Sequence, residues 1–359
     1  MNQLLLVQNN LLEDSSKQDV ALWYDIYKMV YFNITLVDRC QEVVMPYNFK
    51  SNFPMVTTGL DAFSKTYKDV CIERALSLVE YSKQIGKPIL IMYSGGIDST
   101  VVMVSFLMAG VDTTNIRVAL NTTSITENPN FYYNHIRGKF KTVPSEHALD
   151  MLNGDYIVVG GEFNDQLFGS DIYRSIINYG GMELLLSPLI EAKVIPFMVH
   201  TGMSESGARR WFSILSEQIK KTNLCEVALV KDFFWWYNFC FKWQTVYYRI
   251  ILRSNDPKFN AEFTKTYYRQ FFEAGDFQRW SMLNPDKKIR TGWAGYKSTA
   301  KDLIYEYTKD LDYFNNKTKV GSLSGVFRQR DVPNGIDSNL APVFGLDKSL
   351  YYRPNNSFC

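Results

Sequence analysis

The chain has 359 residues, of which 46% are hydrophobic and 21% are charged, and its formal net charge is +2. This length and composition are typical of a globular protein with room for two domains. The near-neutral charge excludes a global basic field that would bind nucleic acid non-specifically, although a local basic patch, and so a nucleic-acid partner, stays open.

The cysteines and the apolar segments bear on the cellular compartment. The five cysteines are odd in number and lack the spacing of a zinc site, which favours a reduced, cytoplasmic protein. The N-terminus has no basic start followed by an apolar run, so no signal peptide is expected. The aromatic-rich stretch Asp232–Tyr248 is interrupted by polar residues, so no membrane span is expected. The aromatic stripe Phe233–Tyr248 is expected to be helix core, with an aromatic groove for stacked bases as the alternative.

The first predicted elements lead up to a buried strand. Residues 1–60 contain a mixed helical pattern near Val20–Thr35 and a proline-containing irregular segment, and we expect an N-terminal appendage. Leu60–Lys83 has apolar residues at helical spacing. Ile89–Tyr93 is a short, continuous apolar run of the kind found in buried parallel strands.

Strands and helices alternate from this point. A helix is predicted from Asp98 to Gly110, and strands are predicted at Ile116–Leu120 and Tyr156–Gly160. This alternation predicts an α/β fold with a doubly wound parallel sheet at residues 61–190. The later patterns are mostly helical, so residues 191–359 are expected to form a substrate or lid region with helices at Glu205–Lys221, Asp232–Arg253, Ala261–Phe272 and Ser298–Tyr307.

The turn after the first strand carries the clearest chemical signal. A glycine-rich turn between a strand and a helix presents backbone N–H groups and the positive helix end to an anion. The hydroxyl groups that could assist belong to Ser94, Ser99 and Thr100. Asp98 would repel a phosphate unless it caps the helix or a Mg²⁺ ion bridges the two. A plain strand-to-helix turn capped by Asp98 is the structural alternative.

The segment Tyr93–Thr100 resembles the pyrophosphate-binding loop of the N-type ATP pyrophosphatases, the PP-loop superfamily. The resemblance implies an adenine nucleotide alpha hydrolase-like core that cleaves ATP to AMP and pyrophosphate. It also implies that Asp98 serves Mg²⁺ while the loop cradles the pyrophosphate. The loop residues implied to bind the nucleotide are Ser94, Gly95, Gly96, Asp98, Ser99 and Thr100.

A second segment, Gly160–Ser170, narrows the resemblance. It is similar to the Gly-Glu-Gly-x-Asp-Glu-Leu-Phe-Gly-Gly segment of asparagine synthetase and β-lactam synthetase. The resemblance implies that Glu162 and Asp165 are catalytic and face the nucleotide, that Asp165 shares the metal with Asp98, and that Gly161 contacts the nucleotide. Carboxylates at the carboxyl end of a parallel strand lie where such sheets bind ligands. A solvated acidic turn is the alternative.

The second segment departs from the family pattern at two positions that bear on the chemistry. At these two positions Phe163 replaces a glycine, and Gln166 replaces the second acidic residue of the Asp-Glu pair. We expect a bulky Phe163 to alter the acceptor pocket, so the nucleotide end of the resemblance is firmer than the substrate end.

Further candidates lie outside the two motifs. Leu120 and Asn121 follow the second strand where the family contacts adenine, with an ordinary strand end as the alternative. The synthetases also bring one late lysine onto the phosphates, where it stabilises the leaving pyrophosphate. Lys297 or Lys301 is the candidate for that catalytic role, with a solvated helix face as the alternative.

The expected function follows from these motifs and from a missing domain. Asparagine synthetase carries a glutaminase domain with cysteine directly after the initiator methionine, whereas this chain has Asn2. We therefore expect a Mg²⁺- and ATP-dependent, AMP-forming carbon–nitrogen ligase that joins a small-molecule carboxylate to ammonia or an amine, a separate amidotransferase being one source of nitrogen. The alternatives are adenylation of a nucleobase or nucleotide in nucleic-acid modification, and a non-catalytic nucleotide-binding protein.

Overall fold

The computed structural model describes residues 37–42, 51–145, 148–201, 203–248, 258 and 261–319. Asn2 and the helical pattern near Val20–Thr35 lie outside these ranges. The chain divides into two compact units. One comprises Thr58–Phe168 and Ala261–Ser322, and the other comprises Met1–Thr57, Gly169–Asn260 and Leu323–Cys359.

The first unit contains a five-stranded sheet in which every neighbouring pair is parallel. This confirms the α/β class with a parallel sheet. The central strands are almost completely buried runs of β-branched and aliphatic residues, as parallel strands covered by helices are. In chain order the strands are β1 Ile89–Met92, β2 Ile116–Leu120, β3 Lys141–Pro144, β4 Ile157–Gly160 and β5 Tyr268–Gln270.

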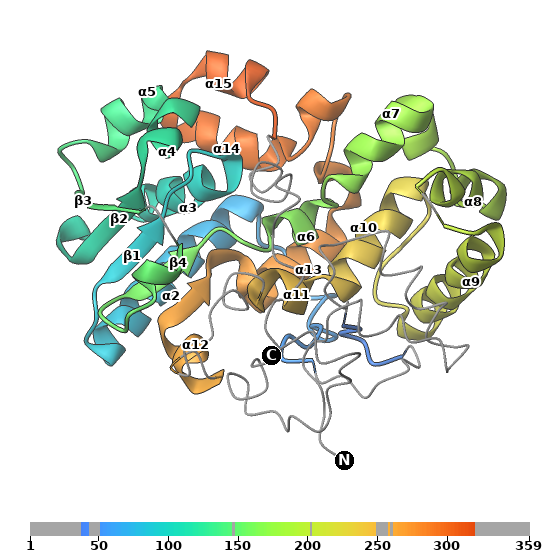
Figure 1. Cartoon of the computed structure of the whole chain (residues 1–359), viewed down its shortest axis with the longest axis horizontal. Coiled ribbons are helices and arrows are strands. Elements are labelled where there is room, and N and C mark those ends of the chain that lie inside the picture. The colour runs from blue at the N-terminus through green and yellow to red at the C-terminus, as the bar shows by residue number, and fades with distance from the viewer. Residues whose placement is uncertain are drawn as a thin grey trace, which may run out of the picture. The chain divides into compact units, whose positions relative to one another are not determined.

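The strand order, β3-β2-β1-β4-β5, creates a point where the chain reverses direction across the sheet (Figure 1). The chain moves from β1 outward to β2 and β3, and then returns to place β4 on the other side of β1. In open α/β sheets, ligands bind outside the carboxyl ends of the strands at such a point. The loops that follow β1 and β4 are therefore the expected place for a site.

Helix α2 (Tyr67–Ile85) begins later than the expected Leu60 because Thr66 caps it. The Thr66 side chain accepts from the backbone N–H of Asp69, whose carboxylate in turn accepts from the N–H of Thr66. The other helices and short helical turns of this unit are α3 Ile97–Met108, η2 Thr113–Asn115, α4 Thr122–Glu127, α5 Pro129–Phe131, η3 Tyr132–Ile136, η4 Ala148–Met151, α6 Asn164–Phe168, α12 Ala261–Tyr267, η6 Phe271–Glu273, α13 Gly275–Leu283, η7 Pro285–Lys287, η8 Trp293–Gly295, α14 Ser298–Thr308 and α15 Leu311–Asn316.

The C-terminal segment 261–319 is part of the α/β unit, whereas the sequence suggested a core limited to residues 61–190. Two contacts explain its place. The residues of β5 pair with Val158, Val159 and Gly160 of β4, and α14 packs against α3 (Figure 1). The end of the helix expected at Ala261–Phe272 is therefore a strand.

The second unit is helical, with α7 Ile172–Leu185, α8 Glu191–His200, α9 Glu205–Thr222, α10 Val230–Phe241 and α11 Trp243–Tyr248. Every residue of α10 is buried, so the aromatic stretch forms helix core as expected. The helix expected at Asp232–Arg253 is two helices up to Tyr248, and its last residues lie outside the described ranges. Within the described part of the chain, no helix has the length and apolarity to cross a membrane.

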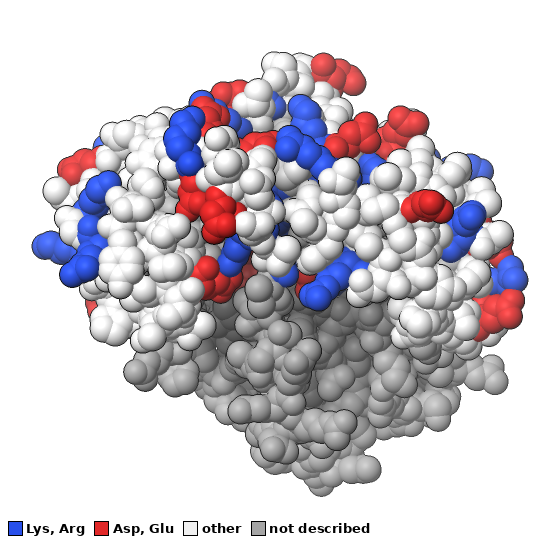
Figure 2. Space-filling view, turned by 90° about the horizontal axis from the view of Figure 1, so that it is seen from above, with Lys and Arg blue, Asp and Glu red and all other residues white. Residues whose placement is uncertain are grey.

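Charged side chains are mixed on the face shown in Figure 2. Lysine and arginine side chains lie among aspartate and glutamate side chains, and they do not gather into one broad stripe on the described part of this face. This distribution matches the formal net charge of +2.

Candidate active site

The loop between β1 and α3 is shaped by Gly95. This residue has φ of +80°, and a Cβ atom there would lie 2.4 Å from the carbonyl oxygen of Ser124 and 2.8 Å from Cβ of Glu127. Only glycine satisfies both the left-handed backbone and the space. Gly96 then stands at the N-cap of α3 in an extended conformation.

The first turn of α3 is left open to an anion. Gly96 has no side chain to cap the helix, and the first N–H groups of any α-helix have no partner within the helix. These groups and the helix dipole together form a positive end at the carboxyl edge of β1. The capping role considered for Asp98 is therefore absent here, since no side chain caps this helix at its N-cap residue.

Hydroxyl groups of the loop hold its shape. The backbone N–H of Ser94 donates to Oγ of Ser99 at 3.1 Å, and the two hydroxyl oxygens lie 3.0 Å apart. The Ser99 hydroxyl donates to the carbonyl oxygen of Gly96 at 3.2 Å. The backbone N–H of Gly96 donates to Oγ of Ser94 at 3.3 Å. Ser94 is exposed at the surface of the loop. Thr100 is completely buried, so its hydroxyl faces the interior and not the loop surface.

The loop after β4 approaches the same helix end through Gly161. A Cβ atom on Gly161 would lie 3.2 Å from the backbone nitrogen of Ser99 and 3.3 Å from the carbonyl carbon of Asp98. The next residue, Glu162, donates its backbone N–H to Oε1 of Gln270 at 3.1 Å, which fastens this loop to the end of β5. The two predicted motifs therefore meet at one edge of the sheet.

Two carboxylates from the two motifs share one lysine. Nζ of Lys297 lies 2.5 Å from Oδ1 and 2.6 Å from Oδ2 of Asp98, and 2.7 Å from Oδ1 of Asp165. The Lys297 side chain is completely buried, while the aspartate side chains keep 25% and 27% exposure. The ammonium group thus lies between two carboxylates that remain accessible to a ligand.

A second layer of contacts surrounds this cluster. Asp165 accepts a hydrogen bond from the Tyr296 hydroxyl at 3.1 Å and pairs with Lys319. Asp98 accepts from Nδ2 of Asn164 at 2.7 Å. The two aspartates and two lysines carry balanced formal charges. A phosphate or a divalent cation would therefore enter a site whose charges are already mutually paired, and the pairs would have to rearrange.

The pKa values of the two carboxyl groups move in opposite directions. Burial acts to raise both. For Asp165, the ammonium groups of Lys297 and Lys319 outweigh burial and hold the pKa below its ordinary value. For Asp98, burial prevails over Lys297, and the negative charge of Asp165 acts in the same direction, so the pKa is raised. Asp165 is thus the more firmly anionic member.

Lys301 lies apart from the carboxylates. Its Nζ donates to the carbonyl oxygen of Ala294 at 3.1 Å, and burial lowers the pKa of its ammonium group. Lys297 lies at the N-cap of α14 with φ of +58°, and its backbone N–H donates to the carbonyl oxygen of Lys288 at 2.9 Å. Of the two lysine candidates, the structure brings Lys297 to the carboxylates.

The departures from the family pattern have a clear structural setting. Phe163 has φ of +79°, a left-handed conformation that glycine adopts at little cost and that a bulky side chain rarely adopts. Its side chain is 1% exposed and Gln166 is 2% exposed. Phe163 therefore packs in the interior of the unit, and its expected effect on an acceptor pocket stays a prediction. Backbone strain of this kind is concentrated at functional sites.

Leu120 and Asn121 lie at the carboxyl end of β2, beside β1. The carbonyl oxygen of Leu120 accepts from the backbone N–H of Ser145 at 3.0 Å. Asn121 caps α4, because its Oδ1 accepts from the N–H of Ser124 at 2.9 Å. Its Nδ2 donates to the carbonyl oxygen of Ser145 at 3.1 Å. These contacts give Asn121 a structural role whether or not a base binds beside it.

Sequence reasoning missed Tyr67, Asn164, Tyr296 and Lys319. Asn164 occupies the variable position of the second motif, and Tyr67 opens a helix whose pattern indicates only core packing. Tyr296 directly precedes Lys297 in the chain, and this position next to a candidate lysine was a usable signal for it. No local pattern marks Lys319.

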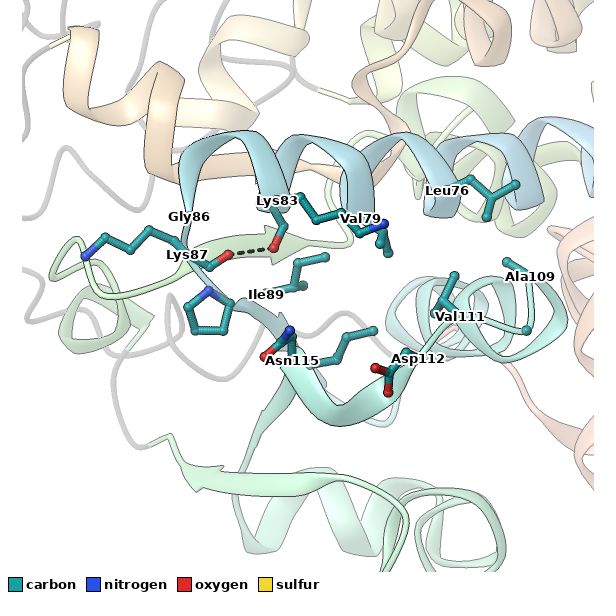
Figure 3. A pocket seen from close by; sticks show the side chains of 14 residues that line it. Leu76, Val79, Lys83, Gly86, Lys87, Ile89, Ala109, Val111, Asp112 and Asn115 are labelled. Atoms are coloured by element: carbon teal, nitrogen blue, oxygen red, sulfur yellow. Dashed lines mark hydrogen bonds between the residues drawn. The ribbon is translucent and has the colours of Figure 1, made fainter.

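A cavity of about 530 Å³ lies at the opposite end of the same strands (Figure 3). Its lining includes Ile89 and Ile116, the first residues of β1 and β2, together with the ends of α2 and α3. The Ser94–Gly96 loop follows the last residue of β1, so this cavity is distinct from the candidate site. Parallel sheets bind their ligands at the carboxyl ends of the strands.

The carboxylates suit a metal that arrives with a ligand. The described residues contain no group of three or more His, Cys, Asp or Glu side chains that could hold a metal ion, so Asp98, Glu162 and Asp165 do not form a three-carboxylate site. Mg²⁺ commonly takes only one or two carboxylates and completes its shell with substrate phosphates and water. Asp98 and Asp165 fit that pattern.

The chain matches no family model, and no match is found among the curated proteins or the solved structures. Its fold defines an α/β protein with a parallel sheet, whose candidate site lies at the carboxyl edge where the strand order reverses.

Proposed function

We propose that the chain is an AMP-forming, Mg²⁺- and ATP-dependent ligase of the asparagine synthetase-like branch of the PP-loop superfamily, with an adenine nucleotide alpha hydrolase-like core. The observation that carries the proposal is the meeting of an uncapped helix end, two partly exposed carboxylates and a buried lysine at one sheet edge. An anion of high charge is the ligand that such a helix end favours.

The residues of the loop would bind the β- and γ-phosphates of ATP. The backbone N–H groups of the first turn of α3 and the exposed hydroxyl of Ser94 would donate to phosphate oxygens. Mg²⁺ held by Asp98 and Asp165 would neutralise charge on the phosphates. Leu120 ends the neighbouring strand β2, and the base would pack beside it.

Lys297 would stabilise the leaving pyrophosphate. Its ammonium group contacts both carboxylates, and a bound triphosphate would offer it further anionic partners. A substrate carboxylate oxygen attacks the α-phosphorus, the bond from that phosphorus to the bridging oxygen breaks, and pyrophosphate leaves. Ammonia or an amine then attacks the acyl carbon, AMP leaves, and the nitrogen loses a proton as the amide forms.

The adenylation step is tested by exchange of labelled pyrophosphate into ATP. Purified chain is incubated with Mg²⁺, ATP and labelled pyrophosphate, without any amine, against one panel of carboxylates and a second panel of nucleotides and nucleobases. We expect label in ATP with the correct carboxylate, since the adenylate step is reversible. Exchange that is supported by nucleotides or nucleobases, and by none of the carboxylates, would move the function to nucleotide modification.

A further inference from the structure

The two oxygens of the Asp98 carboxylate have different partners. Oδ1 accepts from Nζ of Lys297 at 2.5 Å and from Nδ2 of Asn164 at 2.7 Å. Oδ2 accepts from Nζ of Lys297 at 2.6 Å, and the described residues provide no other donor to it. The carboxylate is therefore held mainly by one oxygen, and the other is the one with capacity left for a ligand.

Asn164 is itself held by Tyr67. The Tyr67 hydroxyl donates to Oδ1 of Asn164 at 2.9 Å, and the two residues are 2% and 0% exposed. This orientation of the amide follows from its surroundings, because the reverse orientation would turn an amide oxygen towards the carboxylate of Asp98. Tyr67 thus makes Asn164 a donor to Asp98.

The ring of Tyr67 is fixed by its neighbours. Its centroid lies 4.7 Å from that of Trp280, 5.5 Å from that of Phe168 and 5.9 Å from that of Phe277. At the other end, the left-handed Phe163 directly precedes α6, which begins at Asn164. Tyr67 is therefore placed by packed aromatic rings, and Asn164 is placed by the start of α6.

We propose that Asn164, oriented by Tyr67, is a positioning residue that fixes the Asp98 carboxylate and leaves Oδ2 as the oxygen that meets the divalent cation of a bound nucleotide. This inference rests on the proposed function, since it assumes that a metal–nucleotide complex binds at Asp98. Neither residue touches the nucleotide in this scheme. Outer contacts of this kind commonly tune metal affinity by about 10- to 100-fold.

The test uses Tyr67→Phe, which removes one hydroxyl and keeps the ring packing. Tyr81→Phe is the matched control, because Tyr81 lies on the same helix and its hydroxyl donates to the backbone carbonyl of Thr266 at 3.1 Å. Mn²⁺ binding is followed by electron paramagnetic resonance of the free ion, in the presence of a non-hydrolysable ATP analogue. Affinity for the analogue alone is measured separately in EDTA.

We expect Tyr67→Phe to weaken Mn²⁺ binding by ~10-fold and Asn164→Leu to weaken it by at least as much. Affinity for the analogue in EDTA should stay within about twofold of that of the unaltered chain, because a positioning role acts on the metal and a general loss of structure lowers both affinities. Tyr81→Phe should leave both affinities unchanged. If Asn164→Leu does not fold, Tyr67→Phe decides alone.

The two failures are distinguishable. If the unaltered chain binds Mn²⁺ with the analogue, but Tyr67→Phe matches Tyr81→Phe, the positioning role is overturned and the proposed function stands. If the unaltered chain binds no Mn²⁺ with the analogue, the proposed function fails and the positioning role fails with it.

Discussion

Lys297 lies within 2.7 Å of both Asp98 and Asp165, although 199 residues separate it from Asp98 in the chain. The contact joins the turn after β1, the helix after β4 and the start of α14. The two acidic motifs are thus completed by a residue from the C-terminal segment, and this cluster is the structural basis of the proposed chemistry.

Replacement of Lys297 by methionine should lower AMP formation by about 10²- to 10³-fold, the usual effect of removing one group that stabilises transition-state charge. Loss of the ammonium also leaves two carboxylates facing each other. Removal of one partner of a fully buried ion pair costs about 3–5 kcal/mol. The loss of stability should be smaller here, because the side chains of Asp98 and Asp165 are 25% and 27% exposed. Rates are measured by AMP release, and stability by denaturant unfolding.

Lys301→Met is the matched control. Lys301 lies in the first turn of α14, close to Lys297 in the chain, but its ammonium group donates to the carbonyl oxygen of Ala294. AMP formation by this variant should stay near that of the unaltered chain. If Lys301→Met greatly lowered AMP formation and Lys297→Met changed it little, the assignment of the catalytic lysine to Lys297 would be wrong.

Gly95→Ala should abolish nucleotide binding, because its Cβ would lie 2.4 Å from a backbone oxygen and the loop must shift. Gly86→Ala is the comparison, since Gly86 has φ of +69° and no atom within 4 Å of the position that an added Cβ would take. It should cost about 1–2 kcal/mol of stability for the left-handed backbone and leave binding intact. Calorimetric titration with ATP measures the affinity of each variant, and denaturant unfolding measures its stability. Equal ATP binding by the two variants would contradict the account of the loop.

Phe163→Gly sets backbone strain against packing. Relief of the left-handed conformation should return about 1–2 kcal/mol, whereas removal of a buried phenylalanine costs about 3–5 kcal/mol. The variant should therefore be less stable than the unaltered chain. Lys309→Gly has a similar φ of +56° at an exposed C-cap, so it should gain stability. Denaturant unfolding of the two variants should give changes of opposite sign.

His135 should make stability rise with pH. Its ring contacts those of Phe131 and Tyr307. Burial, with Lys139 nearby, lowers its pKa, while Asp310 acts in the opposite direction. The unfolded chain then binds the proton more tightly than the folded chain does. The stabilising contribution of neutral His135 is therefore present above the ordinary imidazole pKa near 6.5, and it is lost as pH falls towards the lowered pKa of the folded state. Unfolding free energies from pH 5 to 8 should rise more steeply than those of His135→Phe; parallel curves would refute this.

The sequence predicts the central part of the α/β unit well because its signals are local. The apolar runs of β1, β2 and β4 and the glycine turn before α3 can each be recognised within a few residues. The strand β3 is short and largely exposed, and β5 follows a helical pattern, so neither has a recognisable strand signal. Their positions depend on pairing with neighbours far along the chain.

The acidic half of the site was predictable, and its partners were less so. Asp98 and Asp165 belong to motifs with fixed spacing. Lys297 and Lys301 are four residues apart, so by sequence alone both would lie on one face of a continuous helix. In the structure Lys297 is the left-handed N-cap of α14 and Lys301 lies within the helix, which gives the two side chains different surroundings. Asn164 and Tyr67 contact Asp98 and each other through tertiary packing, which leaves no periodic signal.

The most direct test of the central claim is the identity of the phosphorus products. Phosphorus NMR follows ATP in the presence of Mg²⁺, ammonia and the carboxylate that supports pyrophosphate exchange, for the unaltered chain and for Asp98→Asn. We expect AMP and pyrophosphate in equal amounts from the unaltered chain, and a loss of at least ~10²-fold in the variant. Formation of ADP and phosphate, or equal AMP formation by Asp98→Asn, would contradict the account.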